Sequence, residues 1–119
     1  AEDLGPFAYD EGDDYPDFVV PLARRVAMDL ETRGIVVAGS GQGEIIAMNR
    51  VRGARAVEFY GGNLEVVKKT REHNNANTLS VGARFATEDE AKEAIRVFLE
   101  TPFSGEARHK RRLAKIDAL

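Results

Sequence analysis

The sequence contains no cysteine, and it has only two histidines among its 119 residues. Without cysteine there can be no disulfide, no thiolate metal site and no cysteine nucleophile. The two histidines lie far apart in the sequence and neither belongs to a Glu-x-x-His pattern, so we expect no metal centre. No apolar run approaches the roughly 20 residues of a membrane span. These absences together predict a cytoplasmic protein without a membrane partner.

Charge of one sign is not in large excess either, because the net charge is only -3. So mild a balance gives no reason to expect nucleic acid or an anionic membrane as a partner. The charges are nevertheless unevenly placed. Acidic residues crowd positions 1–17, and basic residues crowd the stretch ARHKRRLAK at 107–115. A basic cluster of this kind is either the solvated face of a helix or a binding site for a phosphate.

A chain of 119 residues fits one domain, which we assign to residues 1–119. Hydrophobic spacing and turn residues predict alternating helices and strands. The predicted helices cover residues 16–30, 44–52, 63–73, a segment after residue 87 and a basic segment near the end. The predicted strands cover residues 34–38, 54–60 and 78–82. Such alternation is typical of an α/β fold with a parallel sheet, in which ligands bind beyond the carboxyl ends of the strands.

Three of these elements carry additional local signals. The run from Gly34 to Ala38 is continuously apolar, which predicts a strand buried on both faces. Asn63 is placed to cap the helix that follows it. Thr87 and Glu90 have the spacing of a capping box, which predicts a helix start at that point.

A glycine-rich turn, GSGQG at residues 39–43, joins the first predicted strand to a helix. Glycine allows backbone N–H groups to converge on an oxygen-rich ligand, and a helix start adds partial positive charge. The glycines alternate, so the spacing fails the G-x-G-x-x-G dinucleotide pattern, and no P-loop lysine follows. Nor does Ser40 lie in the G-x-S-x-G form of a nucleophile elbow. The turn is therefore either a plain tight connection or a ligand-binding loop.

Glu44 follows this turn directly, in the first turn of a predicted helix. A carboxylate there is often a surface charge that stabilises the helix dipole. Its position at the carboxyl edge of the sheet offers another interpretation. An ionised carboxylate facing a ligand suits a general base that acts on carbon beside a carbonyl group.

Two further polar groups complete the set of candidates. The stretch REHNNAN at residues 71–77 either caps a helix or forms a polar cluster for sugar hydroxyls, with His73 as an acid or base. Arg108 and Arg112 are four residues apart and share one helix face, where two guanidinium groups can bind a phosphate with several donors. Arg84 follows the third predicted strand and is the remaining cationic candidate.

Several segments together resemble one family, the type B ribose-5-phosphate isomerases and their relatives that act on hexose 6-phosphates. The similar segments are GIVVAGSGQGEIIAMNRVRGARA (34–56), TREHNNANTLSVGAR (70–84), TPFSGEARHKRRLAKI (101–116) and the shorter DYPDF (14–18). The resemblance implies a Rossmann-like three-layer sandwich with a parallel sheet, five-stranded in the family. It also implies homodimers, or dimers of dimers, with active sites shared between subunits and no metal or organic cofactor.

The resemblance also implies roles for individual residues. One subgroup of the family has a cysteine base at the position of Ala38, whereas another uses a glutamate at the position of Glu44, and this sequence is similar to the second. The implied catalytic residues are Glu44, Ser40 and His73, the last of which would open the sugar ring. The implied substrate-binding residues are Gly39, Gly41, Gly43, Asn74 and the phosphate-binding arginines Arg84, Arg108 and Arg112.

The expected reaction is the interconversion of ribose 5-phosphate and ribulose 5-phosphate through an enediolate, with Glu44 moving a proton between C2 and C1. Two alternatives stay open: an isomerase for allose or galactose 6-phosphate, and a sugar-phosphate-binding relative without catalysis. Family members begin with a strand and helix that carry an Asp-His-Ala-Gly motif, and this sequence matches from near their second strand. The resemblance therefore implies either part of a longer protein or a divergent member.

Overall fold

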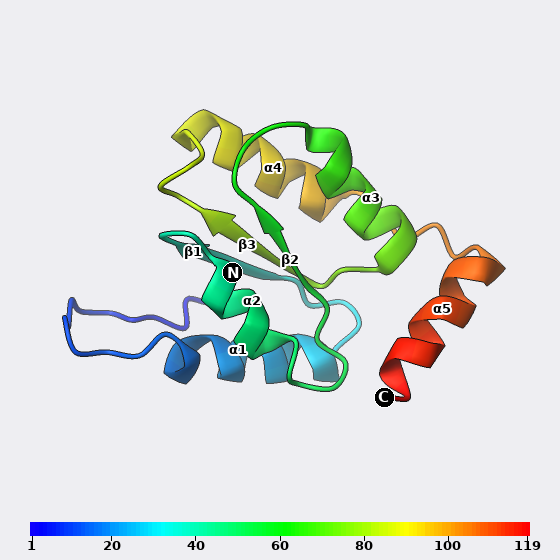
Figure 1. The fold of residues 1–119 in the computed structure, drawn as a ribbon, viewed down its shortest axis with the longest axis horizontal. Helices are drawn as coiled ribbons and strands as arrows, with labels where there is room; N and C mark the ends of the chain where they lie inside the picture. The colour runs from blue at the N-terminus through cyan, green and yellow to red at the C-terminus, as the bar shows by residue number, and fades with distance from the viewer.

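The computed structural model describes residues 1–119, and its elements follow the predicted order (Figure 1). The helices are α1 (Pro16–Met28), α2 (Gln42–Met48), α3 (Leu64–Asn74), α4 (Glu88–Glu100) and α5 (Ala107–Asp117). The strands are β1 (Gly34–Ala38), β2 (Ala56–Phe59) and β3 (Thr78–Gly82). None of these helices is both long and apolar enough to cross a membrane.

The sheet has three parallel strands in the order β1-β3-β2, so the strand that comes last in the chain lies in the middle. Gly34 pairs with Thr78, and Ala38 pairs with Gly82, so β1 and β3 end at the same level. All five residues of β3 are buried. The prediction of a parallel α/β sheet is confirmed, while the five strands expected from the resemblance correspond to three in residues 1–119.

The expectation that β1 is buried on both faces was wrong. β1 pairs only with β3 and is an edge strand, and the Val37 side chain is 64% exposed. The continuous apolar run is nevertheless compatible with a parallel strand, because its neighbours Ile35 and Val36 pack against the two cores on opposite faces of the sheet.

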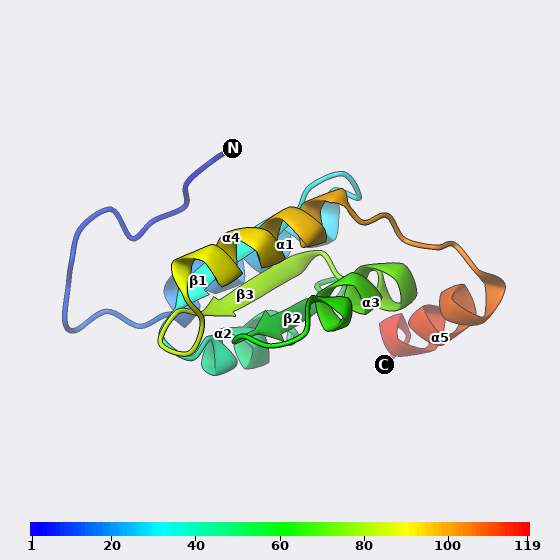
Figure 2. The same ribbon diagram turned by 90° about the horizontal axis from the view of Figure 1, so that it is seen from above.

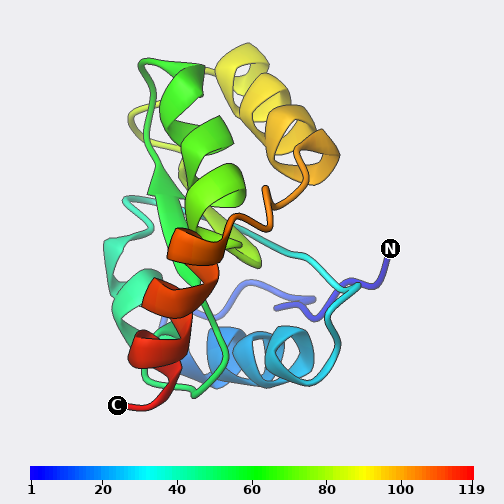
Figure 3. The same ribbon diagram turned by 90° about the vertical axis from the view of Figure 1, so that its right-hand side faces the viewer.

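Helices cover both faces of the sheet and make a three-layer sandwich (Figures 1 and 3). On one face α1 and α2 enclose a core of Val19, Ala23, Met48, Ala54 and Ala56. On the other face α3 and α4 enclose a larger core built from Phe59, Val67, Ala76, Leu79, Val81, Ala94 and Phe98. Figure 2 shows that α5 and the connection to it extend away from the layers at one end of the molecule.

Side-chain caps fix where two of the helices begin, as the sequence predicted. The Asn63 side chain accepts a hydrogen bond from the backbone N–H of Glu65 at the start of α3. Thr87 and Glu90 form the reciprocal bonds of a capping box at the start of α4. Each cap satisfies N–H groups that the helix itself leaves without partners, which is worth about 1 kcal/mol.

Candidate active site

The glycine-rich turn leaves the carboxyl end of β1 and is packed tightly against the sheet at Gly41. The backbone of Gly41 has φ 77°, a left-handed conformation that favours glycine. A methyl group at this position would lie 2.5 Å from Oγ of Ser80 and 2.6 Å from Oε2 of Glu58. The loop is therefore held in one conformation by side chains of β2 and β3 rather than being a free surface turn.

Glu44 lies in the first turn of α2 and is only 8% exposed. The interpretation of this residue as a plain surface charge was therefore wrong. Its Oε2 atom is buried and has no hydrogen-bond partner within the chain. Since buried polar groups are nearly always hydrogen-bonded, a carboxylate oxygen without a donor is available for one that comes from outside the chain.

The other residues of the turn are flanked by side chains from separate elements. Beside Gly39 lies Arg84, whose guanidinium carbon would be 3.0 Å from a methyl group on Gly39. The backbone N–H of Arg84 donates to the Gly39 carbonyl at 3.1 Å. The hydroxyl of Tyr15, just before α1, lies directly against Gly43. The structure thus brings Gly39, Ser40, Gly41, Gly43, Glu44 and Arg84 together; we call this group the loop cluster.

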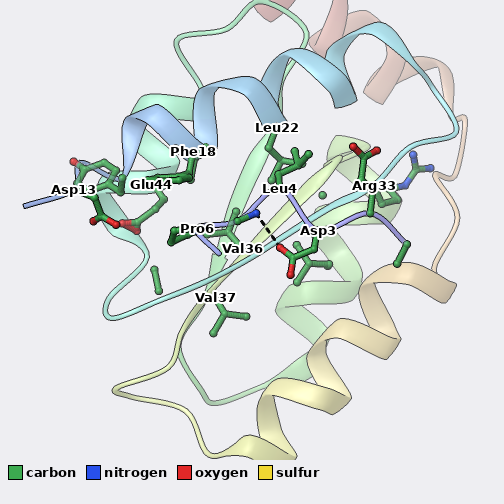
Figure 4. Close-up of a pocket in the computed structure, with 18 residues that line it drawn as sticks. Asp3, Leu4, Pro6, Asp13, Phe18, Leu22, Arg33, Val36, Val37 and Glu44 are labelled. Carbon is green, nitrogen blue, oxygen red and sulfur yellow. Dashed lines mark hydrogen bonds between the residues drawn. The ribbon is translucent and has the colours of Figure 1, made fainter. Parts of the chain in front are cut away.

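A cavity of about 750 Å³ lies beside the loop cluster, between the free edge of β1, α1 and residues 1–6 (Figure 4). Glu44 and Asp13 lie near each other at one end of the cavity, and Asp3 and Arg33 lie toward the other. Apolar side chains such as Leu22 line the middle. The position of Tyr15 on the wall of this cavity was not anticipated from the sequence, although DYPDF was noted as a similar segment.

A second residue that the sequence analysis did not anticipate, the carboxylate Glu58, lies beneath the loop cluster. It comes from β2, and its Oε1 atom is 3.4 Å from the side-chain nitrogen of Gln42. Burial raises the pKa of Glu58 to about 7; Ser80 partly offsets this rise and Glu44 adds to it. The signal in the sequence was a charged residue inside the otherwise apolar strand AVEF.

The remaining predicted site residues form a different group around α3 and α5, which we call the α5 cluster. His73 lies in the last turn of α3 and stacks on His109 of α5, with ring centroids 4.3 Å apart and planes inclined by 16°. Arg108 and Arg112 are exposed on α5, and Asn74 is exposed at the end of α3. The two arginines do share a helix face, as the spacing predicted.

Much of the amide-rich stretch before β3 has a structural role, which favours the capping interpretation for part of it. Asn75 adopts a left-handed conformation (φ 46°) as the C-cap of α3. The side chain of Asn77 accepts a hydrogen bond from the N–H of Arg55 at 2.8 Å and donates one to the carbonyl of Gly53 at 2.9 Å. Asn74 has no such bond within the chain and remains available to a ligand.

Burial lowers the pKa of His109, and the neighbouring His73 and Arg108 lower it further. Its Nε2 atom is buried without a hydrogen bond, although the Glu106 carboxylate lies 3.3 Å away. The lowered pKa favours the neutral form of His109, whose ring packs against that of His73. No three His, Asp or Glu side chains of the chain are grouped so that they could hold a metal ion.

The loop cluster and the α5 cluster do not meet within one chain. The loop cluster follows the carboxyl ends of β1 and β3, whereas His73 and Asn74 lie just before the amino end of β3. Parallel strands of five residues separate these two edges by about 16 Å. Figure 1 shows α5 at the far end of the molecule from the tip of the β3 arrow.

Comparisons with known proteins agree with this geometry and with the sequence resemblance. Residues 1–116 match the Ribose/Galactose Isomerase family. The chain is 43% identical over 111 residues to ribose-5-phosphate isomerase B of Mycolicibacterium paratuberculosis, covering 93% of this chain and 69% of that protein.

Solved structures of similar proteins share the fold. The type B ribose 5-phosphate isomerase of Trypanosoma brucei superposes with a TM-score of 0.89 at 41% identity, covering 97% of this chain and 75% of that one. The crystal structure of ribose-5-phosphate isomerase B from Mycoplasma genitalium contains bound ribulose 5-phosphate. It superposes with a TM-score of 0.87 at 36% identity, covering 97% of this chain and 74% of that one. This chain belongs to the ribose/galactose isomerase family.

Proposed function

We propose that this protein interconverts ribose 5-phosphate and ribulose 5-phosphate through an enediolate, with Glu44 as the base. The single observation that carries the assignment of the base is the buried Glu44 carboxylate, which has one oxygen without a partner beside a backbone loop. The assignment of the substrate is based on the relatives named above, one of which binds ribulose 5-phosphate.

The reaction needs a base on one face of the substrate and hydrogen-bond donors at the oxygen where charge develops. Glu44 would take the proton from C2 of the open-chain aldose and return it to C1 of the enediolate, while the hydroxyl proton passes from O2 to O1 so that the carbonyl group ends at C2. The backbone N–H groups of the turn, with Ser40 exposed on it, would stabilise the negative enediolate oxygen. Donors already fixed in place before reaction are especially effective, and the packing of Gly41 fixes these.

We further propose that a second copy of the chain completes each site. Arg108, Arg112, His73 and Asn74 lie at the opposite edge of the sheet from Glu44, so they cannot serve the same substrate molecule within one chain. A homodimer that places the α5 cluster of one copy beside the loop cluster of the other would join base and phosphate site. Arg84 would then hold the phosphate from the loop side, beside Gly39. Phosphate binding by several guanidinium groups would orient the reacting carbons.

The direct test is the replacement Glu44→Gln, with ketose formation from ribose 5-phosphate as the measurement. Glutamine keeps the shape of the side chain but cannot accept the proton, so we expect kcat to fall by a factor of about 10² to 10⁴. A matched control is Glu65→Gln, which removes an exposed carboxylate from the first turn of α3. Equal turnover by wild type and Glu44→Gln would refute the assignment of Glu44 as the base.

The substrate is tested in the same assay with a panel of aldose phosphates. Galactose 6-phosphate is an alternative because the family description names galactose as well as ribose. Allose 6-phosphate is the other alternative left open by the sequence resemblance. We expect the highest kcat/KM with ribose 5-phosphate. A higher value with either hexose phosphate would reassign the substrate and leave the assignment of Glu44 intact.

A further inference from the structure

Glu58 is the one acidic side chain that supports the loop cluster from inside the fold. Both of its carboxyl oxygens lie under the loop, since a methyl group on Gly41 would be 2.6 Å from Oε2 and 2.8 Å from Oε1. Oε1 is also within 3.4 Å of the side-chain nitrogen of Gln42. Oε2 is buried and has no hydrogen-bond partner. The carboxyl group therefore contacts the loop from the side of the sheet.

Ser80 explains why this carboxyl group needs a proton of its own. The Ser80 hydroxyl is fully buried on β3 and donates its only proton to the carbonyl of Gly41 at 3.1 Å. In this arrangement the Ser80 hydroxyl can act toward Glu58 only as an acceptor, whereas a hydroxyl turned toward Glu58 would donate to the carboxylate and lower its pKa. A protonated Glu58 would donate to the Ser80 oxygen and complete a chain of bonds from β2 through β3 to the loop. An ionised Glu58 could receive the Ser80 proton only if Ser80 gave up its bond to the carbonyl of Gly41, which would release the loop.

The second reason is the neighbouring charge. Gln42 and Ser80, which face Glu58 from the loop side and from β3, are uncharged, and the charged group that acts on it is Glu44 of α2. Two ionised carboxylates at short range in a partly buried site repel each other. The enediolate would bring a third negative charge to the same loop from its other side.

We propose that Glu58 is a positioning residue that acts in its protonated form, holding the glycine loop through Ser80 and keeping negative charge away from the base and the developing enediolate. This inference rests on the proposed function, because it assumes that Glu44 is the base. Burial, which raises the pKa of Glu58 to about 7, supports it. Loss of the proton above that pH places a negative charge under the loop and weakens stabilisation of the enediolate.

The test is the pH dependence of kcat/KM for Glu58→Gln relative to wild type. Glutamine has the shape of the protonated carboxyl group, keeps a donor for Ser80 and cannot ionise. We expect the ratio of variant to wild type to rise about tenfold between pH 6 and pH 8.5, because only the wild type acquires the charge. Titration of the substrate phosphate cancels in this ratio. For the control Glu65→Gln the ratio should stay constant across the same range.

A purely structural role gives a different result. If Glu58 only fills space, Glu58→Gln and wild type will have parallel pH profiles, and the proposal is overturned. The non-polar variant Glu58→Leu adds a second arm: loss of the bond to Ser80 should lower kcat/KM at every pH, including pH 6. A flat ratio in a protein whose turnover depends on Glu44 would overturn this inference and leave the proposed function standing.

A measurement that does not depend on turnover distinguishes failure of this inference from failure of the proposed function. Carboxyl carbon NMR of the full chain should show Glu58 titrating near neutral pH in the wild type and at lower pH in Glu44→Gln, because removal of the neighbouring charge relieves the repulsion. Titration of Glu58 in the ordinary range near 4.3, or a midpoint unaffected by Glu44→Gln, would overturn the proposal even if the protein proved inactive.

Discussion

Replacing Gly41 with alanine tests how firmly the loop is packed against the sheet. The new methyl group would meet Ser80 Oγ at 2.5 Å and the two Glu58 oxygens at 2.6 and 2.8 Å, all closer than non-bonded atoms can approach. It would also require a non-glycine residue at φ 77°. The backbone conformation costs about 1–2 kcal/mol for an L-residue, and the overlap adds about 1–3 kcal/mol. We therefore expect Gly41→Ala to lower the free energy of unfolding by about 2–5 kcal/mol.

The chain provides a matched control for this estimate in Gly62. This glycine has φ 96°, but a methyl group on it would have nothing within 4 Å. Gly62→Ala should thus lower the free energy of unfolding only by the cost of the backbone conformation, about 1–2 kcal/mol. Both substitutions restrict the unfolded chain to the same extent, so that contribution cancels in the comparison.

The assay is urea unfolding of the two variants and the wild type, followed by circular dichroism and analysed for the free energy in water and the slope m. Ketose formation by the folded Gly41→Ala protein reports on the loop itself, and we expect it to fall more than tenfold because the backbone donors move. Equal losses of stability for the two variants would refute the packing argument, since it predicts that only Gly41 meets neighbouring atoms.

Two further predictions concern the α5 cluster. The first prediction concerns co-refolding of Glu44→Gln with the double variant Arg108→Ala/Arg112→Ala, each of which should be inactive alone. If each site uses both copies of a dimer, about half of the dimers are mixed and each has one intact site, so about a quarter of wild-type activity should return. No recovery after co-refolding would refute the shared site. The lowered pKa of His109 means that its neutral form contributes stability above the ordinary histidine pKa, and this stability is lost as the pH falls through that value toward the folded one. Thermal unfolding should therefore show a loss of stability below about pH 6.5 that His109→Phe lacks; identical pH profiles would contradict this account.

The sequence was sufficient for the fold because its local signals agree with one another. The caps at Asn63 and Thr87 form as predicted, and the apolar runs become the three strands. The exposure of β1 could not be predicted, because an apolar strand has the same pattern in the middle of a sheet and at its edge. Only the pairing of strands distant in sequence decides which of the two it is.

Part of the candidate site could be predicted because it depends on local sequence alone. The residues of the turn are consecutive, so their grouping with Glu44 follows from local structure. Tyr15 and Glu58 join them from other elements, and no spacing in the sequence indicates that contact. Predicting that His73 lies far from Glu44 requires knowing which way the strands run. His73 lies before the amino end of β3 and Glu44 lies after the carboxyl end of β1, so the two residues are at opposite edges of the sheet.

The central place of β3 has a consequence for how the chain reaches its folded state. β1 and β2 do not pair with each other, and every strand pairing involves residues 78–82. Neither of these two pairings can therefore form during synthesis until residues 78–82 have left the ribosome, since each pairing closes a loop from a strand that comes earlier in the chain. Until then the larger core, which includes Leu79 and Val81 of β3, stays incomplete, and its apolar side chains remain exposed.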